Sequence, residues 1–150
     1  MKKLLLLIAL SFTLNAEQVE VTALEFEADE KSGVSYFRSS VFIKKGVDEI
    51  RADLLKINFD KNNKPTIYDA SGNVTFKITT SSQRYEGQSD HIIYEPSNKK
   101  YKAFGNVNIK ETTKGQTLRG ESITIDRVSG KARFKGSNNR PVKFIFTVEE

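Results

Sequence analysis

The chain has 150 residues, of which 24 are Lys or Arg and 19 are Asp or Glu, and it contains one histidine and no cysteine. The lack of cysteine excludes disulfides and a lipoprotein anchor, and together with the single histidine it argues against a zinc site. The net charge of +5 is scattered along the chain and does not gather in one block. Nucleic acid is therefore not an expected partner.

The first sixteen residues have the pattern of an export signal. Met1-Lys2-Lys3 is positively charged, an apolar run follows over residues 4–14, and Ala16 ends the segment with a small side chain. The apolar run is shorter than the roughly 20 residues that a membrane-spanning helix needs. We therefore predict a cleaved signal peptide over residues 1–16 and a single exported domain over residues 17–150. A retained membrane anchor is the alternative.

Short strands are predicted at the start of the exported part. Val19-Glu20-Val21-Thr22 alternates apolar and polar residues, as a half-buried strand does. The apolar set changes from odd to even positions before Leu24, which predicts a bulge that returns the next strand, over residues 24–28, to the same face. A turn over residues 29–33 leads to a short strand that starts at Val34. We interpret this segment as a degenerate half-unit of a repeat.

One β unit then recurs along the chain. The run Gly72-Asn73-Val74-Thr75-Phe76-Lys77-Ile78 returns as Gly105-Asn106-Val107-Asn108-Ile109-Lys110, and the spacing from Val74 to Val107 is 33 residues. Weaker copies lie over residues 39–44 and 141–146. The apolar residues have a period of two and no helical periodicity is present, so we predict an all-β fold of stacked antiparallel units. Polar breaks over residues 61–65, 96–100 and 127–131 have the composition of hairpin turns.

Two pairs of glycines recur with the unit. Gly72 and Gly105 directly precede their predicted strands and are expected to supply turn or bulge conformations that other residues rarely adopt. Gly87 and Gly120 lie inside their predicted strands, which indicates close backbone approach or strong curvature. Both interpretations are structural.

The sequence contains no catalytic constellation. His91 is the only imidazole and is expected to be an exposed residue at the start of a strand. No Gly-x-Ser-x-Gly elbow, Walker loop or dinucleotide-binding glycine loop is present. Residues 60–65 lack the glycine and the terminal acid of a calcium loop. We therefore predict a protein that is not an enzyme and has no cofactor and no metal.

The repeat does provide a long row of apolar side chains on one face of the strands. If two sheets meet closely, this row is only a sandwich core. If the sheets separate, the row becomes an apolar trough along the molecule. The alternation by itself favours the closed core.

The last apolar segment, over residues 142–148, does not alternate cleanly, because Ile145 lies on the face of Lys143 and Thr147. An apolar edge strand needs cover against aggregation. A partner strand that adds to the edge is one form of cover. Packing of Ile145 under a loop of the same chain is the other.

Several of these features together resemble the OstA-like family. They are the predicted export signal, the recurring β units of about 33 residues, the openings at Gly72 and Gly105, and the strand endings Ile57-Asn58-Phe59-Asp60 and Ile123-Thr124-Ile125-Asp126. The resemblance spans nearly all of residues 17–150, and departs from the pattern at Ser39-Ser40 and Arg140-Pro141, where Gly-Asn is expected. It implies an open, twisted β-jelly-roll in the periplasm.

The resemblance also implies a function: carriage of lipopolysaccharide from the inner to the outer membrane, with its acyl chains shielded in an apolar groove. The alternatives are a membrane-tethered, LptC-like component of the same pathway and a ligand-free structural β-repeat adaptor. Lys77, Lys110 and Arg119 are candidates to meet lipid phosphates, although solvated surface charge is the favoured account. The expected groove residues are Val41, Ile43, Ile57, Phe59, Val74, Phe76, Ile78, Ile92, Tyr94, Val107, Ile109, Leu118, Ile123, Ile125, Phe134 and Phe144, and the apolar row continues at Val142 and Phe146.

Finally, the resemblance implies partners that join by edge strands. They are further copies in a head-to-tail homo-oligomer, an inner-membrane LptC-like protein and an outer-membrane LptD-like translocon. The expected edge residues are Val19, Val21, Val142, Phe144, Ile145 and Phe146.

Overall fold

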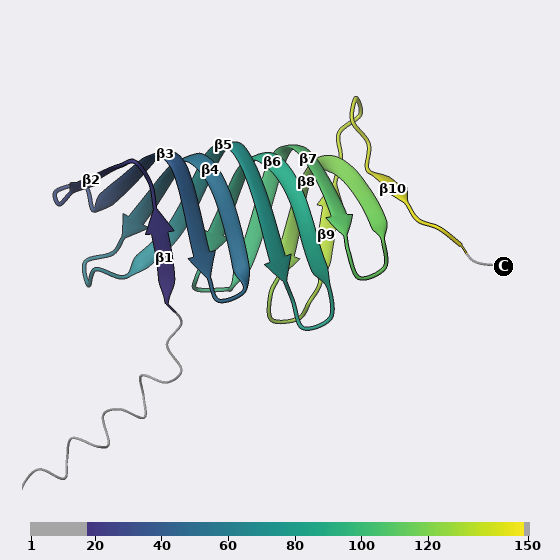
Figure 1. The fold of residues 1–150 in the computed structure, drawn as a ribbon, viewed down its shortest axis with the longest axis horizontal. Helices are drawn as coiled ribbons and strands as arrows, with labels where there is room; N and C mark the ends of the chain where they lie inside the picture. The colour runs from purple at the N-terminus through teal and green to yellow at the C-terminus, as the bar shows by residue number, and fades with distance from the viewer. Residues whose placement is uncertain (1–17, 149–150) are drawn as a thin grey trace, which may run out of the picture.

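The computed structural model describes residues 18–148, and every regular element in that range is a β-strand. The strands are β1 (Val19–Thr22), β2 (Glu25–Asp29), β3 (Val34–Lys45), β4 (Asp48–Phe59), β5 (Pro65–Thr79), β6 (Arg84–Glu95), β7 (Lys100–Glu111), β8 (Gln116–Asp126), β9 (Ala132–Lys135) and β10 (Lys143–Ile145). They form one ten-stranded antiparallel sheet whose two ends lie far apart (Figure 1). This confirms the predicted all-β fold of antiparallel units. The predicted signal peptide lies outside the described residues.

The six long strands, β3 to β8, have 11 to 15 residues and bend near the middle. The pairing is interrupted there, for example between Ser71 and Val74 in β5 and between Phe104 and Val107 in β7. The bends line up along one side of the molecule, which we call the ridge (Figure 1). Each long strand therefore gives one half to each of two facing layers, and the sheet is an open, twisted β-jelly-roll.

We name the two layers after the strands at their N-terminal end. β1 pairs with residues 42–45 of β3, whereas β2 pairs with residues 34–38 of the same strand. At the other end, β10 continues the β1 layer and β9 continues the β2 layer, because they pair with opposite halves of β8. The chain thus crosses the ridge between β1 and β2. The predicted bulge that keeps Val21 and Phe26 on one face is wrong, since these residues lie in different layers.

The Gly-Asn pairs form the ridge. Gly72 and Asn73 have φ values of +82° and +48°, and Gly105 and Asn106 have +81° and +51°. Two consecutive left-handed residues turn the strand from one layer into the other, and glycine adopts this conformation without strain. The expected special conformation at both glycines is confirmed, but they lie inside β5 and β7 and not ahead of the strands.

The ridge also explains the two departures from the Gly-Asn pattern. Ser39 and Ser40 have φ values of 70° and 51°, so the crossing inside β3 has the same left-handed pair without a glycine. At the last crossing, residues 136–142 separate β9 from β10, and the Arg140 side chain donates to Asn106 Oδ1 on the neighbouring β7 crossing. The crossing in β3 thus keeps the left-handed pair, whereas the last crossing is a loop without positive φ values.

Gly87 and Gly120 lie where another group comes very close. A Cβ atom on Gly87 would be 2.7 Å from Ile109 Cγ1 and 2.8 Å from Phe76 Cζ, and one on Gly120 would be 3.0 Å from the carbonyl oxygen of Lys135. The prediction of close approach is confirmed at both positions.

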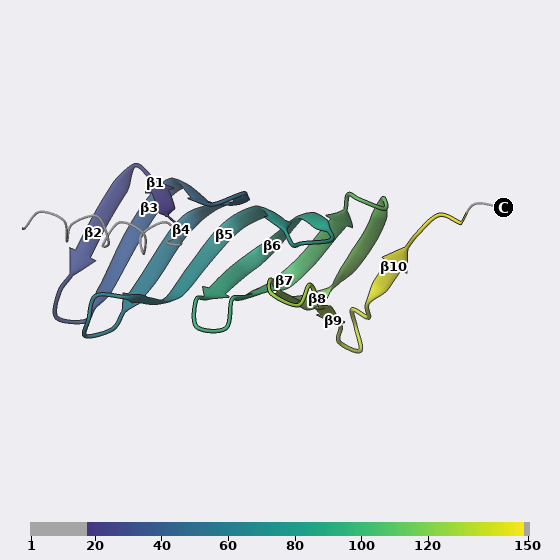
Figure 2. The same ribbon diagram turned by 90° about the horizontal axis from the view of Figure 1, so that it is seen from below.

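The turns between the long strands lie on the side opposite the ridge, which we call the mouth. Residues 46–47, 80–83 and 112–115 connect strands of the β1 layer, and residues 60–64, 96–99 and 127–131 connect strands of the β2 layer. Figure 2 views the molecule from this side, with β1 and β2 at one end and β9 and β10 at the other. The apolar interior lies between the layers, from the ridge to the mouth.

Candidate functional site

Most of the predicted groove residues point between the two layers and are buried. Alternation along each strand half brings them to the same face, and antiparallel pairing aligns them across neighbouring strands. Pairs such as Ala70 with Ile92 and Ile109 with Leu118 repeat this alignment. The buried predicted residues are Val41, Ile43, Ile57, Val74, Phe76, Ile78, Ile92, Tyr94, Val107, Ile109, Ile123 and Ile125.

The remaining predicted groove residues lie at the margins of the interior. Phe59 at the end of β4, Leu118 in β8 and Phe134 in β9 are half-buried. Val142, Phe144 and Phe146 are exposed, with fractions of 41%, 46% and 54%. Phe144 pairs in register with Leu118, which pairs with the buried Ile109, so it lies on the face of the sheet that points between the layers. These residues are exposed because β10 is the last strand of its layer and nothing in residues 18–148 lies beyond it.

Sequence reasoning missed a second set of interior residues. The alternation of β4, followed backward from Ile57, would have identified Leu55. It would not have identified Ala52 and Ile50, because the inward positions change from odd to even at the ridge. The pairing of neighbouring strands would have identified further interior residues, since Tyr101 of β7 pairs with the predicted Tyr94 of β6. The missed buried residues are Ile50, Ala52, Leu55, Ala70, Tyr85, Tyr101 and Ala103.

The interior is filled by its own side chains. The pocket between the layers at the mouth end, lined by Ile43, Leu55, Tyr94 and Tyr101 among others, has a volume of about 20 Å³. Such a space holds about one water molecule. The two layers therefore meet as a closed core in this structure, and a lipid chain can enter only if the layers move apart.

A polar cluster joins the two layers at the mouth. Asp48, at the start of β4 in the β1 layer, is 1% exposed. Its Oδ2 accepts hydrogen bonds from the Tyr101 hydroxyl at 2.8 Å and from Arg127 Nε at 2.7 Å, and both donors belong to the β2 layer. The Thr79 N–H donates to Asp48 Oδ1 at 3.0 Å within the β1 layer. We call Asp48, Tyr101 and Arg127 the clasp.

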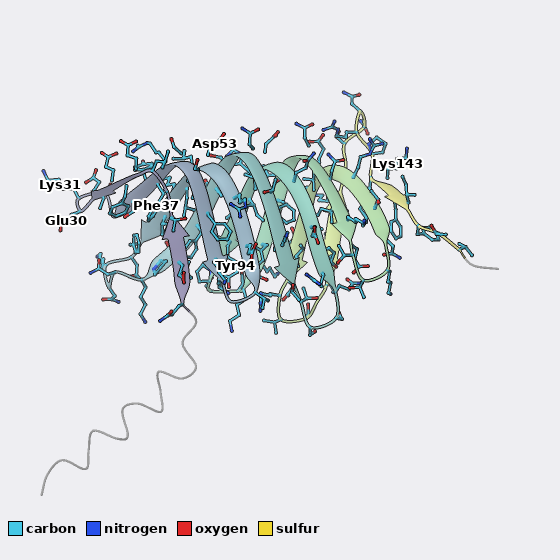
Figure 3. The ribbon with its side chains drawn as sticks, viewed as in Figure 1. Glu30, Lys31, Phe37, Asp53, Tyr94 and Lys143 are labelled. Atoms are coloured by element: carbon cyan, nitrogen blue, oxygen red, sulfur yellow. The ribbon has the colours of Figure 1, made fainter. Side chains whose placement is uncertain are left out.

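The surroundings of the clasp keep Tyr101 neutral. Burial raises the pKa of the Tyr101 hydroxyl far above its ordinary value, and the nearby Asp48 carboxylate and its hydrogen bond raise it further. The phenol therefore stays a donor to Asp48. Beside it, Tyr94 packs on Tyr101 with ring centroids 4.5 Å apart, and Lys45 Nζ of the opposite layer lies 4.8 Å from the Tyr94 ring centroid. Figure 3 shows Tyr94 near the mouth and Asp53 on the ridge.

Charge differs between the mouth and the ridge. Asp53 and Asp90 on the ridge accept hydrogen bonds from Asn73 Nδ2 at 2.8 Å and Asn106 Nδ2 at 2.9 Å. The turns at the mouth carry exposed cations, and the acids Asp60, Glu111 and Asp126 accept hydrogen bonds from N–H groups of their own turns. Burial would raise the pKa of Glu111, but the N–H groups of Lys114 and Thr113 hold it below its ordinary value. The exposed cations at the mouth are Lys61, Lys64, Arg84, Lys99, Lys100, Lys114 and Lys131.

The other cations that the sequence singled out have a different position. Lys77 and Lys110 are exposed on the outer face of the β1 layer, where Lys77 is paired in register with Glu49 and Glu86. Arg119 is exposed on the same face of β8. Alternating charges on neighbouring strands stabilise their register, so Lys77 and Lys110, which both pair with Glu86, have a structural role on the outside. Arg119 pairs with Asn108 and Lys143 and has no acidic partner in register.

His91 is half-exposed inside β6, and not at the start of a strand as expected. Its ring stacks on Phe104 with centroids 4.8 Å apart, and its Nε2 lies 4.0 Å from Asp69 Oδ1. Within residues 18–148, no three His, Asp or Glu side chains are grouped so that they could hold a metal ion. In the same range no helix is long and apolar enough to span a membrane.

The ends of the sheet are the predicted edges. Val19 and Val21 in β1 are half-buried, while Ile145 in β10 is 52% exposed. The alternative in which Ile145 packs under a loop of its own chain is wrong for the described residues. The strands at the two ends also differ in charge: β2 carries Glu25, Glu27 and Asp29, whereas β9 and β10 carry Arg133, Lys135 and Lys143.

Comparison with known proteins gives one family and one fold. The family model described as LptA/(LptD N-terminal domain) LPS transport protein matches residues 20–131. The structure is similar to the crystal structure of LptH from Pseudomonas aeruginosa, described as the LptA-homologous periplasmic component of the lipopolysaccharide transport device. The TM-score is 0.77 at 17% identity, over 88% of this chain and 96% of that chain. No curated protein matches the sequence.

Proposed function

This chain belongs to the LptA/(LptD N-terminal domain) family of LPS transport proteins, and from that premise we propose that it is a periplasmic bridge protein that carries lipopolysaccharide. In this proposal the acyl chains occupy the interior between the layers, and the protein shields them from water on the way from the inner to the outer membrane. The observation that carries the proposal is an apolar interior that runs the length of the sheet beneath a single ridge.

The energetics of the interior suit a carrier. Each CH₂ group removed from water contributes about 0.8 kcal/mol, and an acyl chain would replace side-chain contacts such as those of Phe76 and Ile109 with similar apolar contacts. The layers are joined by backbone along the ridge and by side chains at the mouth. Lipid contacts of similar strength along the interior would let the lipid move from one end to the other without an enzyme-like site.

The charges at the mouth suit an anionic lipid. The exposed cations of the mouth, such as Lys61, Lys99 and Lys131, would face the phosphate groups while the acyl chains lie inside. The ridge, with Asp53 and Asp90, would repel the same phosphates. We infer that the sugars and phosphates of the lipid leave the protein through the mouth into water.

We also propose that copies join head to tail. Across the sheet the strands alternate in direction, so the free edge of β10 can accept β1 of a next copy in antiparallel pairing, and β9 can accept β2. Acidic β2 would then meet basic β9. Such a contact is heterologous and does not close, so it extends into a filament. The same edges would receive an LptC-like partner at the inner membrane and an LptD-like partner at the outer membrane.

One observation favours a second candidate, a structural adaptor with no ligand. The interior is filled, with a cavity of only about 20 Å³. Thermal unfolding with and without purified lipopolysaccharide distinguishes the two candidates, because a ligand that binds only the folded state raises the melting temperature. A carrier shows a rise that grows with lipid concentration. An unchanged melting temperature at all concentrations would favour the adaptor.

A further inference from the structure

The turn between β8 and β9, residues 127–131, lies across the mouth as a rigid strap. The Gly130 N–H donates to the Asp126 carbonyl at 2.8 Å, and Asp126 Oδ1 accepts from the N–H groups of Val128 and Ser129 at 3.0 and 3.1 Å. The Arg127 N–H donates to the Lys99 carbonyl of the adjacent turn at 3.1 Å. These bonds fix the strap to the β2 layer.

The strap comes close to the opposite layer at two points. Arg127 Nε donates to the buried Asp48 carboxylate of β4, which also accepts from Tyr101. A Cβ atom placed on Gly130 would lie 3.5 Å from Ser82 Oγ, in the turn between β5 and β6. Asp48 and Ser82 belong to the β1 layer and the strap belongs to the β2 layer, so the Arg127–Asp48 bond joins the layers and Gly130 lies beside Ser82 across the mouth.

The ion pair of the clasp is a kind of contact that can break when the layers separate. A buried ion pair is often no more stable than apolar residues of the same shape, so stability alone does not require one in an apolar interior. When the layers separate, water can solvate Asp48 and Arg127. The planar guanidinium of Arg127 also matches a phosphate group as well as a carboxylate, and it lies on the side where the exposed cations gather.

We propose that the strap is a latch: Arg127 and Tyr101 hold Asp48 to keep the layers closed, and the latch must open before an anionic, acylated lipid can enter, when Arg127 passes from Asp48 to a lipid phosphate. This inference rests on the proposed carrier function and names the gate of that same interior. The lipid is recognised by two properties, acyl chains for the interior and a phosphate for Arg127.

A reversible covalent lock tests the latch. The chain has no cysteine, so the double variant Ser82→Cys/Gly130→Cys can form only one intramolecular disulfide, and the short distance between these positions suits that bond. Uptake of fluorescently labelled lipopolysaccharide is followed by fluorescence anisotropy in the oxidised and the reduced protein. The latch predicts that uptake is lost on oxidation and restored by reduction, while each single variant takes up lipid under both conditions.

Cysteine is strained at position 130, where φ is +76°, so a second variant provides an independent test. Tyr101→Phe removes one hydrogen bond of the clasp and keeps the ring. It is compared with Tyr36→Phe, which also removes a single hydroxyl and keeps the ring, on the outer face of β3 where Arg38 Cζ lies 4.9 Å from the ring centroid. The latch predicts faster uptake for Tyr101→Phe than for the wild type and an unchanged rate for Tyr36→Phe.

The outcomes separate the latch from the carrier function. Equal uptake by the oxidised and reduced double variant, or equal rates for the two Tyr→Phe variants, overturns the latch and leaves the carrier function standing. A wild-type protein that takes up no lipopolysaccharide overturns both.

Discussion

At the scale of single residues, the least expected feature is a buried carboxylate at the mouth end of an apolar interior. Asp48 is almost completely buried and is satisfied by three donors from three strands or turns. Removing one partner of a buried ion pair leaves the other charge without compensation, which destabilises more than the pair itself stabilises. Asp48 therefore depends strongly on Arg127.

We expect Arg127→Ala to lower the free energy of unfolding by about 3 kcal/mol, because it leaves the buried Asp48 carboxylate without its cation. Urea denaturation measures the loss. Lys131→Ala, in the same turn but exposed, serves as the control and should change stability by about 0.5 kcal/mol or less. Equal effects of the two substitutions would show that Asp48 does not need Arg127.

Tyr101 gives the clasp a predictable response to alkaline pH. Its pKa in the folded protein is raised above the ordinary value of 10.0, so the unfolded chain loses this proton first as pH rises. The stability that Tyr101 contributes is therefore complete below pH 10 and falls as pH increases above it. Denaturation curves between pH 8 and 11 should show a steeper loss for the wild type than for Tyr101→Phe. Parallel losses would contradict the raised pKa.

At the scale of elements, the ridge explains both what the sequence predicts well and what it does not. The recurrence of Gly72-Asn73 at Gly105-Asn106 identifies the repeat, and their left-handed conformation follows from residue type. The length of the strands does not follow from residue type. The alternation of apolar and polar residues breaks at each ridge crossing, and in the sequence such a break resembles the end of a strand. The same holds before Leu24, where the apolar residues change from odd to even positions. This pattern predicts a bulge, but in the structure the chain passes into the other layer there.

Gly72→Ala should destabilise the protein more than Gly115→Ala. Both glycines have positive φ, at +82° and +73°, so alanine costs about 1–2 kcal/mol at either position. A Cβ atom at position 72 would also lie 2.8 Å from Asp53 Oδ2, whereas position 115 has nothing within 4 Å. Thermal or urea unfolding of the two variants isolates this clash. Equal losses would mean that Asp53 moves aside freely and that the ridge is not tightly packed.

At the scale of the whole molecule, the features that sequence patterns do not predict depend on contacts between residues far apart in the chain. Alternation and register account for most of the interior, including Phe76 and Ile109. The clasp joins residues 53 and 79 positions apart, and no periodic pattern relates an acid at the start of one strand to an arginine in a distant turn. Whether the layers meet or separate likewise depends on side-chain packing across the interior, which alternation does not report.

The exposed edge strands at the two ends of the molecule lead us to predict that copies associate. Ile145→Asp should weaken head-to-tail contacts, because it places a charge on the exposed face of β10 where a second copy would pair. Sedimentation velocity should show a shift toward the monomer, with an unchanged far-ultraviolet circular dichroism spectrum. Val47→Asp, a substitution at another exposed apolar residue, in the turn between β3 and β4, is the control. An unchanged oligomer distribution for Ile145→Asp would exclude β10 as the contact.

The central claim, that lipid occupies the interior, is tested most directly by photo-crosslinking in cells. A photoreactive residue at Phe76, buried between the layers, is compared with one at the adjacent Thr75, exposed on the outer face. The carrier account predicts lipopolysaccharide adducts at position 76 and none at position 75. A folded, exported protein with no adduct at position 76 would contradict it and would leave the closed interior as a structural core.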